Sequence, residues 1–235
     1  MKTDPANRNS RSKNALLVVA KRPQPGETKT RLTPPLSDEQ ASLLYEHFLK
    51  DTLVLVRQVV GVQPVLAYLP ANGETYFCSI APDFERLLQT GSNLGERLDH
   101  ALTHYLERGF QKAVIMDSDS PTLPVCYLEA AFDVLDDGAD VALGPCEDGG
   151  YYLIGLKRPA PRLLREVQMS TPNVTADTLA LADKLRLKVT LLPEWYDVDD
   201  ATALMRLNKE LMVAPPGIAI HTREFIRQLP LRDPK

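Results

Sequence analysis

Two aspartates, Asp117 and Asp119, follow directly after the apolar segment 113–116, which is typical of a buried strand. Hard divalent cations take carboxylate oxygens as ligands and complete their shell with water and substrate phosphates. The spacing therefore indicates a site at which Mg²⁺ or Mn²⁺ links the protein to a diphosphate. The alternative is a turn in which Asp119 and Ser120 cap the next helix.

A second group of carboxylates, Asp197, Asp199 and Asp200, lies near the end of the chain. It follows a predicted strand at 188–192 and precedes the last predicted helix, so it can lie at the same sheet edge as the first group. Two acidic groups far apart in the sequence could then converge on one metal ion. The alternative is that Asp199 caps the last helix and Asp200 interacts with its dipole.

Cations are concentrated in residues 21–32, the loop after the first predicted strand, which contains Lys21, Arg22, Lys29 and Arg31. Such groups donate charge-assisted hydrogen bonds to phosphate oxygens and can offset the charge on a leaving diphosphate. The loop has neither a Walker A sequence nor a G-x-G-x-x-G fingerprint. It is therefore interpreted either as a phosphate-binding loop of another kind or as a solvated basic loop.

Glu147, Asp148, Gly149 and Gly150 form a loop between two predicted strands. Glycines allow the backbone to approach a ligand closely. Asp148 could act as a general base toward an acceptor hydroxyl or could orient that group. The alternative is an ordinary glycine turn whose acids face water.

A capping motif opens the helix predicted over 94–107, where Asn93 is the expected N-cap and Glu96 completes a capping box. The segment 91–97 could in addition be a binding loop. The chain has no G-x-S-x-G nucleophile elbow, so covalent hydrolysis is disfavoured.

The predicted elements alternate between strands and helices along most of the chain. This order predicts a single Rossmann-like α/β domain with a mostly parallel sheet, helices on both faces and ligands at the carboxyl ends of its strands. The strands are expected at 15–20, 64–69, 86–89, 113–116, 141–143, 151–156 and 188–192, and the helices after Ser37 and at 94–107, 125–135, 175–185 and 200–211.

Length and composition favour one domain, since the chain has 235 residues and 44% hydrophobic content. A net charge of -4 does not provide the positive field that nucleic-acid binding requires. Three widely spaced cysteines without a C-x-x-C pair favour free thiols, and the apolar run 15–20 is too short to span a membrane, so a cytoplasmic protein is expected. Residues 1–13 are predicted to be a disordered arm and 213–235 a C-terminal extension whose role the sequence does not indicate.

Four segments together resemble the DUF2064 family of GT-A-type nucleotide-diphospho-sugar transferases. They are Ala20-Lys21-x-Pro23-x-Pro25-Gly26-x-x-Lys29-Thr30-Arg31-Leu32, Gly91-x-x-Leu94-Gly95-Glu96-Arg97, Asp117-Ser118-Asp119-x-Pro121 and Gly144-Pro145-x-x-Asp148-Gly149-Gly150-Tyr151-Tyr152-Leu153-Ile154-Gly155. The resemblance extends over roughly residues 14–212.

The resemblance implies a GT-A fold and a divalent cation held by Asp117 and Asp119. The family is similar in fold to the molybdenum-cofactor and phospholactate guanylyltransferases, and the segment 197–199 resembles their late metal-binding stretch. The segment 170–174 resembles a family segment near the acceptor. Asn93 stands where the family is expected to have an acid.

The sequence therefore predicts a metal-dependent transferase that uses a nucleotide-diphosphate-sugar donor and a small-molecule acceptor. One alternative is a nucleotidyltransferase that acts on a phosphorylated acceptor with a nucleoside triphosphate, and another is a non-catalytic nucleotide-binding module. The predicted catalytic residues are Asp148, Lys29 and Arg31; the nucleotide-binding residues Ala20, Lys21, Gly26, Lys29, Arg31, Gly91, Asn93 and Arg97; the Mg²⁺ or Mn²⁺ ligands Asp117, Asp119, Asp197 and Asp199; and the acceptor-side residues Glu147, Gly149, Gly150, Ser170 and Thr171. The oligomeric state is not indicated.

Overall fold

The protein is built around one seven-stranded sheet with the strand order β3-β2-β1-β4-β6-β5-β7. The computed structural model describes residues 12–229 and 231. Only β6 runs antiparallel to its two neighbours, while the other pairs of adjacent strands are parallel. The strands are β1 (Asn14–Lys21), β2 (Val62–Leu69), β3 (Glu85–Leu88), β4 (Lys112–Met116), β5 (Val141–Pro145), β6 (Tyr151–Leu156) and β7 (Val189–Leu191).

Both faces of the sheet are covered, which explains why its central strands are continuous apolar runs. In β1, Leu16 and Val18 belong to the core on one face, and Ala15 and Leu17 to the core on the other. The predicted α/β fold class, with a mostly parallel sheet and helices on both sides, is confirmed.

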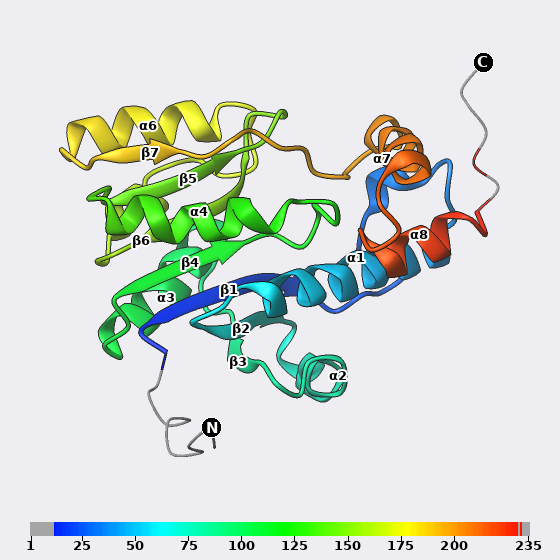
Figure 1. The fold of residues 1–235 in the computed structure, drawn as a ribbon, viewed down its shortest axis with the longest axis horizontal. Helices are drawn as coiled ribbons and strands as arrows, with labels where there is room; N and C mark the ends of the chain where they lie inside the picture. Colours follow the sequence, from blue (N-terminus) through cyan, green and yellow to red (C-terminus); the bar gives the residue numbers. More distant parts are fainter. Residues whose placement is uncertain (1–11, 230, 232–235) are drawn as a thin grey trace, which may run out of the picture.

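The helices from α1 to α6 divide between these two cores (Figure 1). The core around Leu16 receives α1 (Asp38–Gln58), α2 (Glu74–Ile80) and α4 (Val125–Asp136). The core around Leu17 receives α3 (Leu94–Glu107), α5 (Pro161–Arg165) and α6 (Val174–Lys184). Ser37 and Gln40 form the predicted capping box at the start of α1.

A third core lies beyond the carboxyl ends of the parallel strands, where the N-terminal half of α1 extends past the sheet (Figure 1). There the 3₁₀ turn η2 (Thr30–Leu32) packs with α7 (Ala201–Val213) and α8 (Ile220–Ile226). Leu32 is fully buried in this core. It thereby anchors the end of the basic loop beside the segment that precedes α7.

Helix α8 lies within the segment after residue 212 and is fastened to α1. Asp51, buried in α1, accepts hydrogen bonds from the backbone N–H groups of His221 (3.1 Å) and Thr222 (2.7 Å). These donors belong to the first turn of α8, where a helix leaves its N–H groups without internal partners. Buried Arg223 also donates to backbone carbonyls of residues 211–218.

Three short helices, α2, α5 and α8, were not predicted, and two cap assignments from the sequence were wrong. Asp200, not Asp199, caps α7 by accepting from Ala203 N (2.8 Å). Glu96 does not complete a capping box with Asn93, because its carboxylate accepts from Ser92 N (2.8 Å) instead.

Most of the predicted arm 1–13 lies outside the described residues. Among those described, no helix has both the length and the apolar character needed to cross a membrane. The cytoplasmic location stays a prediction.

Candidate functional site

The turn after β4 points its two aspartates toward the carboxyl edge of the sheet and its serine into the protein. Asp117 Oδ1 accepts a hydrogen bond from Asp119 N (3.2 Å), which closes a tight turn. Ser118 donates to the backbone carbonyl of Val19 in β1 (3.0 Å). The alternative that Asp119 and Ser120 cap the next helix is wrong, because α4 begins only at Val125 and has no side-chain cap.

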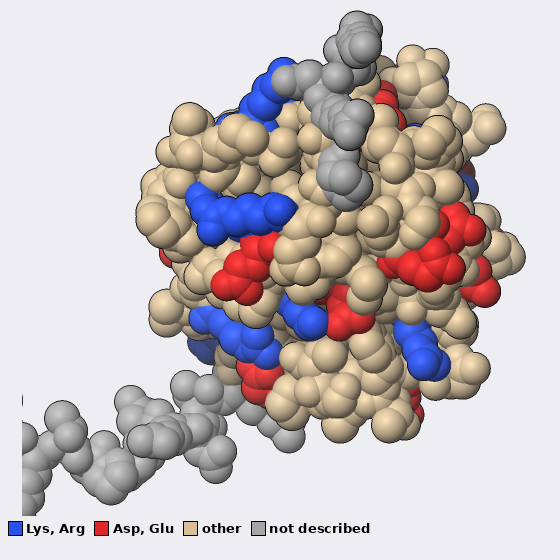
Figure 2. Space-filling model, turned by 90° about the vertical axis from the view of Figure 1, so that its right-hand side faces the viewer, with Lys and Arg blue, Asp and Glu red and all other residues tan. Residues whose placement is uncertain are grey.

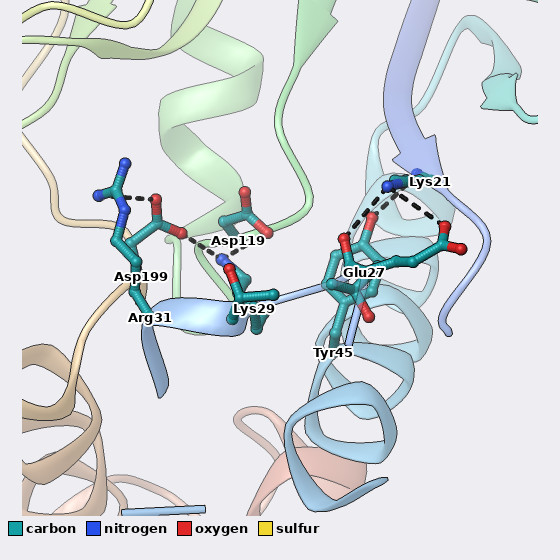
Figure 3. A pocket seen from close by; sticks show the side chains of 9 residues that line it. Lys21, Glu27, Lys29, Arg31, Tyr45, Asp119 and Asp199 are labelled. Atoms are coloured by element: carbon teal, nitrogen blue, oxygen red, sulfur yellow. Dashed lines mark hydrogen bonds and ion pairs between the residues drawn. The ribbon is translucent and has the colours of Figure 1, made fainter. Parts of the chain in front are cut away.

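Lys29 joins the two acidic groups. Its Nζ lies 2.8 Å from Asp119 Oδ1 and 2.5 Å from Asp199 Oδ1, as Figure 3 shows. The side chain of Lys29 is only 6% exposed, and its backbone adopts the left-handed conformation with φ 53°. Arg31 lies on the outer side of the same group, with Nη1 3.7 Å from Asp199 Oδ2. The predicted meeting of early cations with acids from the middle and end of the chain is therefore present.

Charge balance between these groups shifts their pKa values. Burial raises the pKa of Asp119, and the Lys29 ammonium only partly opposes this effect. Burial also acts to raise the pKa of Asp199, but the nearby Lys29 ammonium outweighs it and holds that pKa below its usual value. Burial acts to lower the pKa of Lys29, yet the two carboxylates raise it overall, so its ammonium stays charged.

Tyr45 of α1 is a site residue that the sequence analysis missed. Its hydroxyl accepts from Lys21 N (3.1 Å) and lies 2.9 Å from Ser118 Oγ. Because Ser118 gives its only proton to Val19 O, Tyr45 must be the donor to Ser118. Burial, with a smaller effect of Asp119, raises the pKa of Tyr45 to about 12. The sequence did contain a signal for this role. Tyr45 lies on the predicted apolar face of a helix, where a buried hydroxyl needs a hydrogen-bond partner.

Two cavities meet at this point. The first, of about 250 Å³, is charged and is lined by the basic loop 27–31 together with Asp119 and Asp199. The second, of about 300 Å³, has a largely apolar wall that includes Val19, Leu94 and Ile115. Lys21, Tyr45 and Asp119 line both. The site therefore offers a polar compartment beside an apolar one. The side of the molecule that lies at the right in Figure 1 carries cations and acids interspersed on its surface (Figure 2).

A further acidic group lies beside this pair of cavities. Cys146, Asp148 and Asp197 each offer a ligand atom, and these atoms lie within 4.8 Å of one another. Burial, then the charges of Asp199 and Asp148, raises the pKa of Asp197 to about 6. Burial and then Asp119 likewise raise the pKa of Asp117.

The carboxylates at this edge are only partly balanced by cations. Asp119 and Asp199 share the ammonium of Lys29, whereas Asp117 and Asp197 have no ion-pair partner among the described residues. Oxygen donors of this kind suit a hard divalent cation. The residues present therefore fit the Mg²⁺ or Mn²⁺ that the sequence predicts.

The loop that carries Asp148 is fixed by the segment before α6. Asp148 Oδ1 accepts from Gly150 N (2.8 Å) and the side chain is exposed. Gly149 has φ +90°, and a Cβ there would lie 1.8 Å from the carbonyl oxygen of Pro172. Thr175 N donates to Gly149 O (2.9 Å). The glycine is thus required for both its backbone conformation and its close packing.

Other predicted acceptor-side residues lie around this loop. Glu147 is paired with Arg206 of α7 (2.6 Å), so its carboxylate already has a cation partner. Ser170 has a left-handed backbone with φ 63°. Thr171 is half-buried, and its hydroxyl donates to Gln168 O (3.4 Å).

Some of the predicted nucleotide-binding residues line the two cavities, namely Lys21, Lys29 and Arg31, and the others do not. Lys21 lines both cavities and its Nζ lies 3.6 Å from Glu27 Oε2, whereas Gly26, with φ +72°, does not line either. Ala20 is buried at the end of β1. The segment 91–97 contributes Leu94 to the apolar cavity, while its remaining predicted members lie outside the lining of both cavities. Gly91 has φ +141°, Asn93 caps α3 by accepting from Glu96 N (2.9 Å), and half-buried Arg97 leaves Nε without a hydrogen-bond partner.

The sheet order and the site at the carboxyl edge define a GT-A-like α/β fold. A family model, DUF2064, "Uncharacterized protein conserved in bacteria", matches residues 52–171. The chain belongs to this family. It is also similar to a Desulfovibrio desulfuricans G20 protein to which nucleotide-diphospho-sugar transferase activity has been ascribed, with 30% identity and a TM-score of 0.83 over 92% of this chain and 98% of the other.

More distant solved structures share the fold alone. A cytidylyltransferase from Leptospira borgpetersenii has 13% identity and a TM-score of 0.57, over 93% of this chain and 95% of the other. The 4-diphosphocytidyl-2C-methyl-D-erythritol synthase of Anaerococcus prevotii has 10% identity and a TM-score of 0.56, over 85% and 97% respectively. No curated protein matches the sequence.

Proposed function

We infer that this protein is a transferase that takes a nucleotide-diphosphate-sugar donor and passes the sugar to a small-molecule acceptor. The observation that carries this inference is the pair of adjoining cavities that share Lys21, Tyr45 and Asp119. A nucleoside fits the apolar compartment, and a diphosphate fits the compartment beside the basic loop. The similarity to the Desulfovibrio desulfuricans protein supports the same donor class.

The cations of the basic loop take different parts in this proposal. Arg31, whose side chain is 74% exposed, and Lys21, at 48%, each have N–H groups beyond their contacts with Asp199 and Glu27 that can donate hydrogen bonds to phosphate oxygens. Lys29 is enclosed between Asp119 and Asp199 and fixes the position of both carboxylates. Lys29 would therefore assist the leaving diphosphate in two ways. Its ammonium supplies positive charge, and it holds the two carboxylates in position.

A divalent cation belongs to the proposal, with Asp117 and Asp119 as its first ligands and Asp197 and Asp199 beside them. When bound, Mg²⁺ or Mn²⁺ supplies positive charge that stabilises the departing diphosphate. On the acceptor side, Asp148 is the proposed base because its carboxylate is exposed next to the glycine loop. Glu147, held by Arg206, orients that loop.

Nucleotidyl transfer is the second candidate. The fold is shared with cytidylyltransferases, and the same loop cations could stabilise in-line attack on the α-phosphate of a nucleoside triphosphate. The two reactions release different products. Sugar transfer yields a nucleoside diphosphate, whereas nucleotidyl transfer yields pyrophosphate.

Product analysis tests the proposal directly. The protein is incubated with Mn²⁺, a panel of small hydroxylated and phosphorylated acceptors, and either nucleotide-sugars or nucleoside triphosphates. Release of a nucleoside diphosphate from a nucleotide-sugar, lost in Asp117→Asn, is the expected result. Release of pyrophosphate from a triphosphate would favour nucleotidyl transfer. Nucleotide binding without turnover of any donor would favour a non-catalytic module.

A further inference from the structure

Cys146, Asp148 and Asp197 come together because two loops are joined through their backbones. Cys146 and Trp195 form a parallel bridge outside the named strands. Glu147 N donates to Trp195 O (3.0 Å), and Trp195 N donates to Pro145 O (3.1 Å). The cluster is therefore positioned by main-chain hydrogen bonds rather than by the chance orientation of flexible side chains.

The thiol of Cys146 is the most enclosed member of the cluster, since this residue is only 5% exposed. It has no hydrogen-bond partner among the described residues, yet its sulfur lies within 4.8 Å of a carboxylate oxygen of both Asp148 and Asp197. A buried thiol that serves only as a small apolar side chain has no need of two carboxylates beside it. Its position next to them points to a shared ligand.

No described cation is paired with the carboxylates of this cluster. Lys29 is held by Asp119 and Asp199, and Arg206 by Glu147. Asp148 accepts only the backbone hydrogen bond from Gly150. The cluster thus combines negative charge, a buried thiol and an opening to solvent at Asp148.

We propose that Cys146, Asp148 and Asp197 form a binding site for a divalent transition metal ion such as Zn²⁺ or Co²⁺, next to the ion at Asp117 and Asp119, and that Asp197 is a ligand of this second ion rather than of the first. Thiolate is a soft ligand, which favours these ions over Mg²⁺. Ligand atoms around one tetrahedral ion lie about 3.5 Å apart. Small side-chain rotations would therefore bring the three ligand atoms from their observed spacing of up to 4.8 Å to the spacing that an ion requires. Three protein ligands leave one position of a tetrahedral ion open for water or substrate.

This site has a consequence for Asp148. A carboxylate oxygen that binds an ion is not available to take a proton from an acceptor, so an ion bound here would block the proposed base role of Asp148, which belongs to the ion-free state of the cluster. The proposed ion site does not depend on the nucleotide-sugar donor, so measurements of metal binding alone can test it.

The test is a Co²⁺ titration followed by near-ultraviolet absorption, in which cobalt–thiolate bonds give charge-transfer bands. Cys78 and Cys126 are exposed, so the double variant Cys78→Ser/Cys126→Ser leaves Cys146 as the one thiol of the chain. With excess Mg²⁺ present to occupy the site at Asp117 and Asp119, we expect a saturable band at one Co²⁺ per chain. Zn²⁺ at one equivalent should abolish the band, whereas a large excess of Mg²⁺ should leave it in place.

Variants of the cluster make the test specific. Adding Cys146→Ser should abolish the band, and adding Asp197→Asn, which keeps the thiol, should weaken Co²⁺ binding at least about tenfold. Asp133→Asn on α4 is the control and should change nothing. Zn²⁺ should also slow alkylation of Cys146 in the folded double variant. The proposal is overturned if the double variant gives no band, if Asp197→Asn binds Co²⁺ as tightly as the double variant, or if Mg²⁺ displaces Co²⁺ at equal concentration.

Discussion

Replacing Lys29 with methionine should destabilise the fold strongly, because the substitution keeps the length of the side chain but removes its charge. Loss of one partner from a fully buried ion pair costs about 3–5 kcal/mol, and loss from an exposed pair at most about 1 kcal/mol. Lys29 is 6% exposed, but Asp119 and Asp199 are 32% and 37% exposed, so water partly screens the two carboxylates. The expected loss of unfolding free energy is therefore about 2 kcal/mol.

Urea unfolding at neutral pH in the presence of a chelator measures this loss without interference from divalent ions. Lys50→Met is the matched control, since Lys50 pairs with Glu46 one helical turn away (2.7 Å) and both side chains are partly exposed. It should cost only about 0.3–0.5 kcal/mol. Added Mg²⁺ should stabilise Lys29→Met more than the wild type, because the ion replaces the lost ammonium. A loss no larger than that of the control would refute the reasoning.

Three further variants test other parts of the structure. Gly149→Ala should cost about 2 kcal/mol more than Gly109→Ala, because both glycines have nearly the same φ, +90° and +93°, but only the Cβ at 149 would strike Pro172; equal losses in thermal unfolding would contradict the close packing. Arg223→Met should lower the free energy of unfolding by about 3 kcal/mol, since its buried guanidinium donates to one carbonyl in the last turn of α7 and to another just after this helix; a loss below about 1 kcal/mol would mean that packing alone holds α8. Burial, then a nearby lysine, lowers the pKa of His47, so its contribution to stability is present above the unfolded pKa of about 6.5 and is lost as pH falls through the lower folded value. His47→Gln should therefore lose less stability than the wild type between about pH 7.5 and about pH 5, and an unchanged pH dependence of urea unfolding would count against this.

The fold could be predicted because its signals are local. The apolar run in β1 reflects burial on both faces, and the capping box of Ser37 and Gln40 marks the start of α1 within one residue. Helix α8 escaped prediction because it is short, follows two prolines and begins where Asp51, distant in the sequence, accepts its first N–H groups. Such a helix owes its position to tertiary contacts rather than to its own sequence.

The candidate site was predictable in its residue types but not in its pairings. Asp199 and Asp200 are adjacent and chemically identical, and only the position of Lys29 decides that Asp199 faces the cavity while Asp200 caps α7. Tyr45 reads as one more buried residue of α1 until the fold brings its hydroxyl to β1 and Ser118. Pairings of this kind depend on the register of elements far apart in the chain.

The central claim is that the charged cavity and the apolar cavity together hold one nucleoside diphosphate with a divalent cation. Calorimetric titration of the common nucleoside diphosphates, with and without Mn²⁺, measures this most directly. We predict that at least one of them binds in the presence of Mn²⁺, and that Arg31→Ala weakens binding at least about tenfold. Arg57→Ala, which breaks an exposed ion pair with Asp83, should leave the affinity unchanged. Absence of binding by every nucleoside diphosphate, or equal affinity in Arg31→Ala and the wild type, would contradict the account.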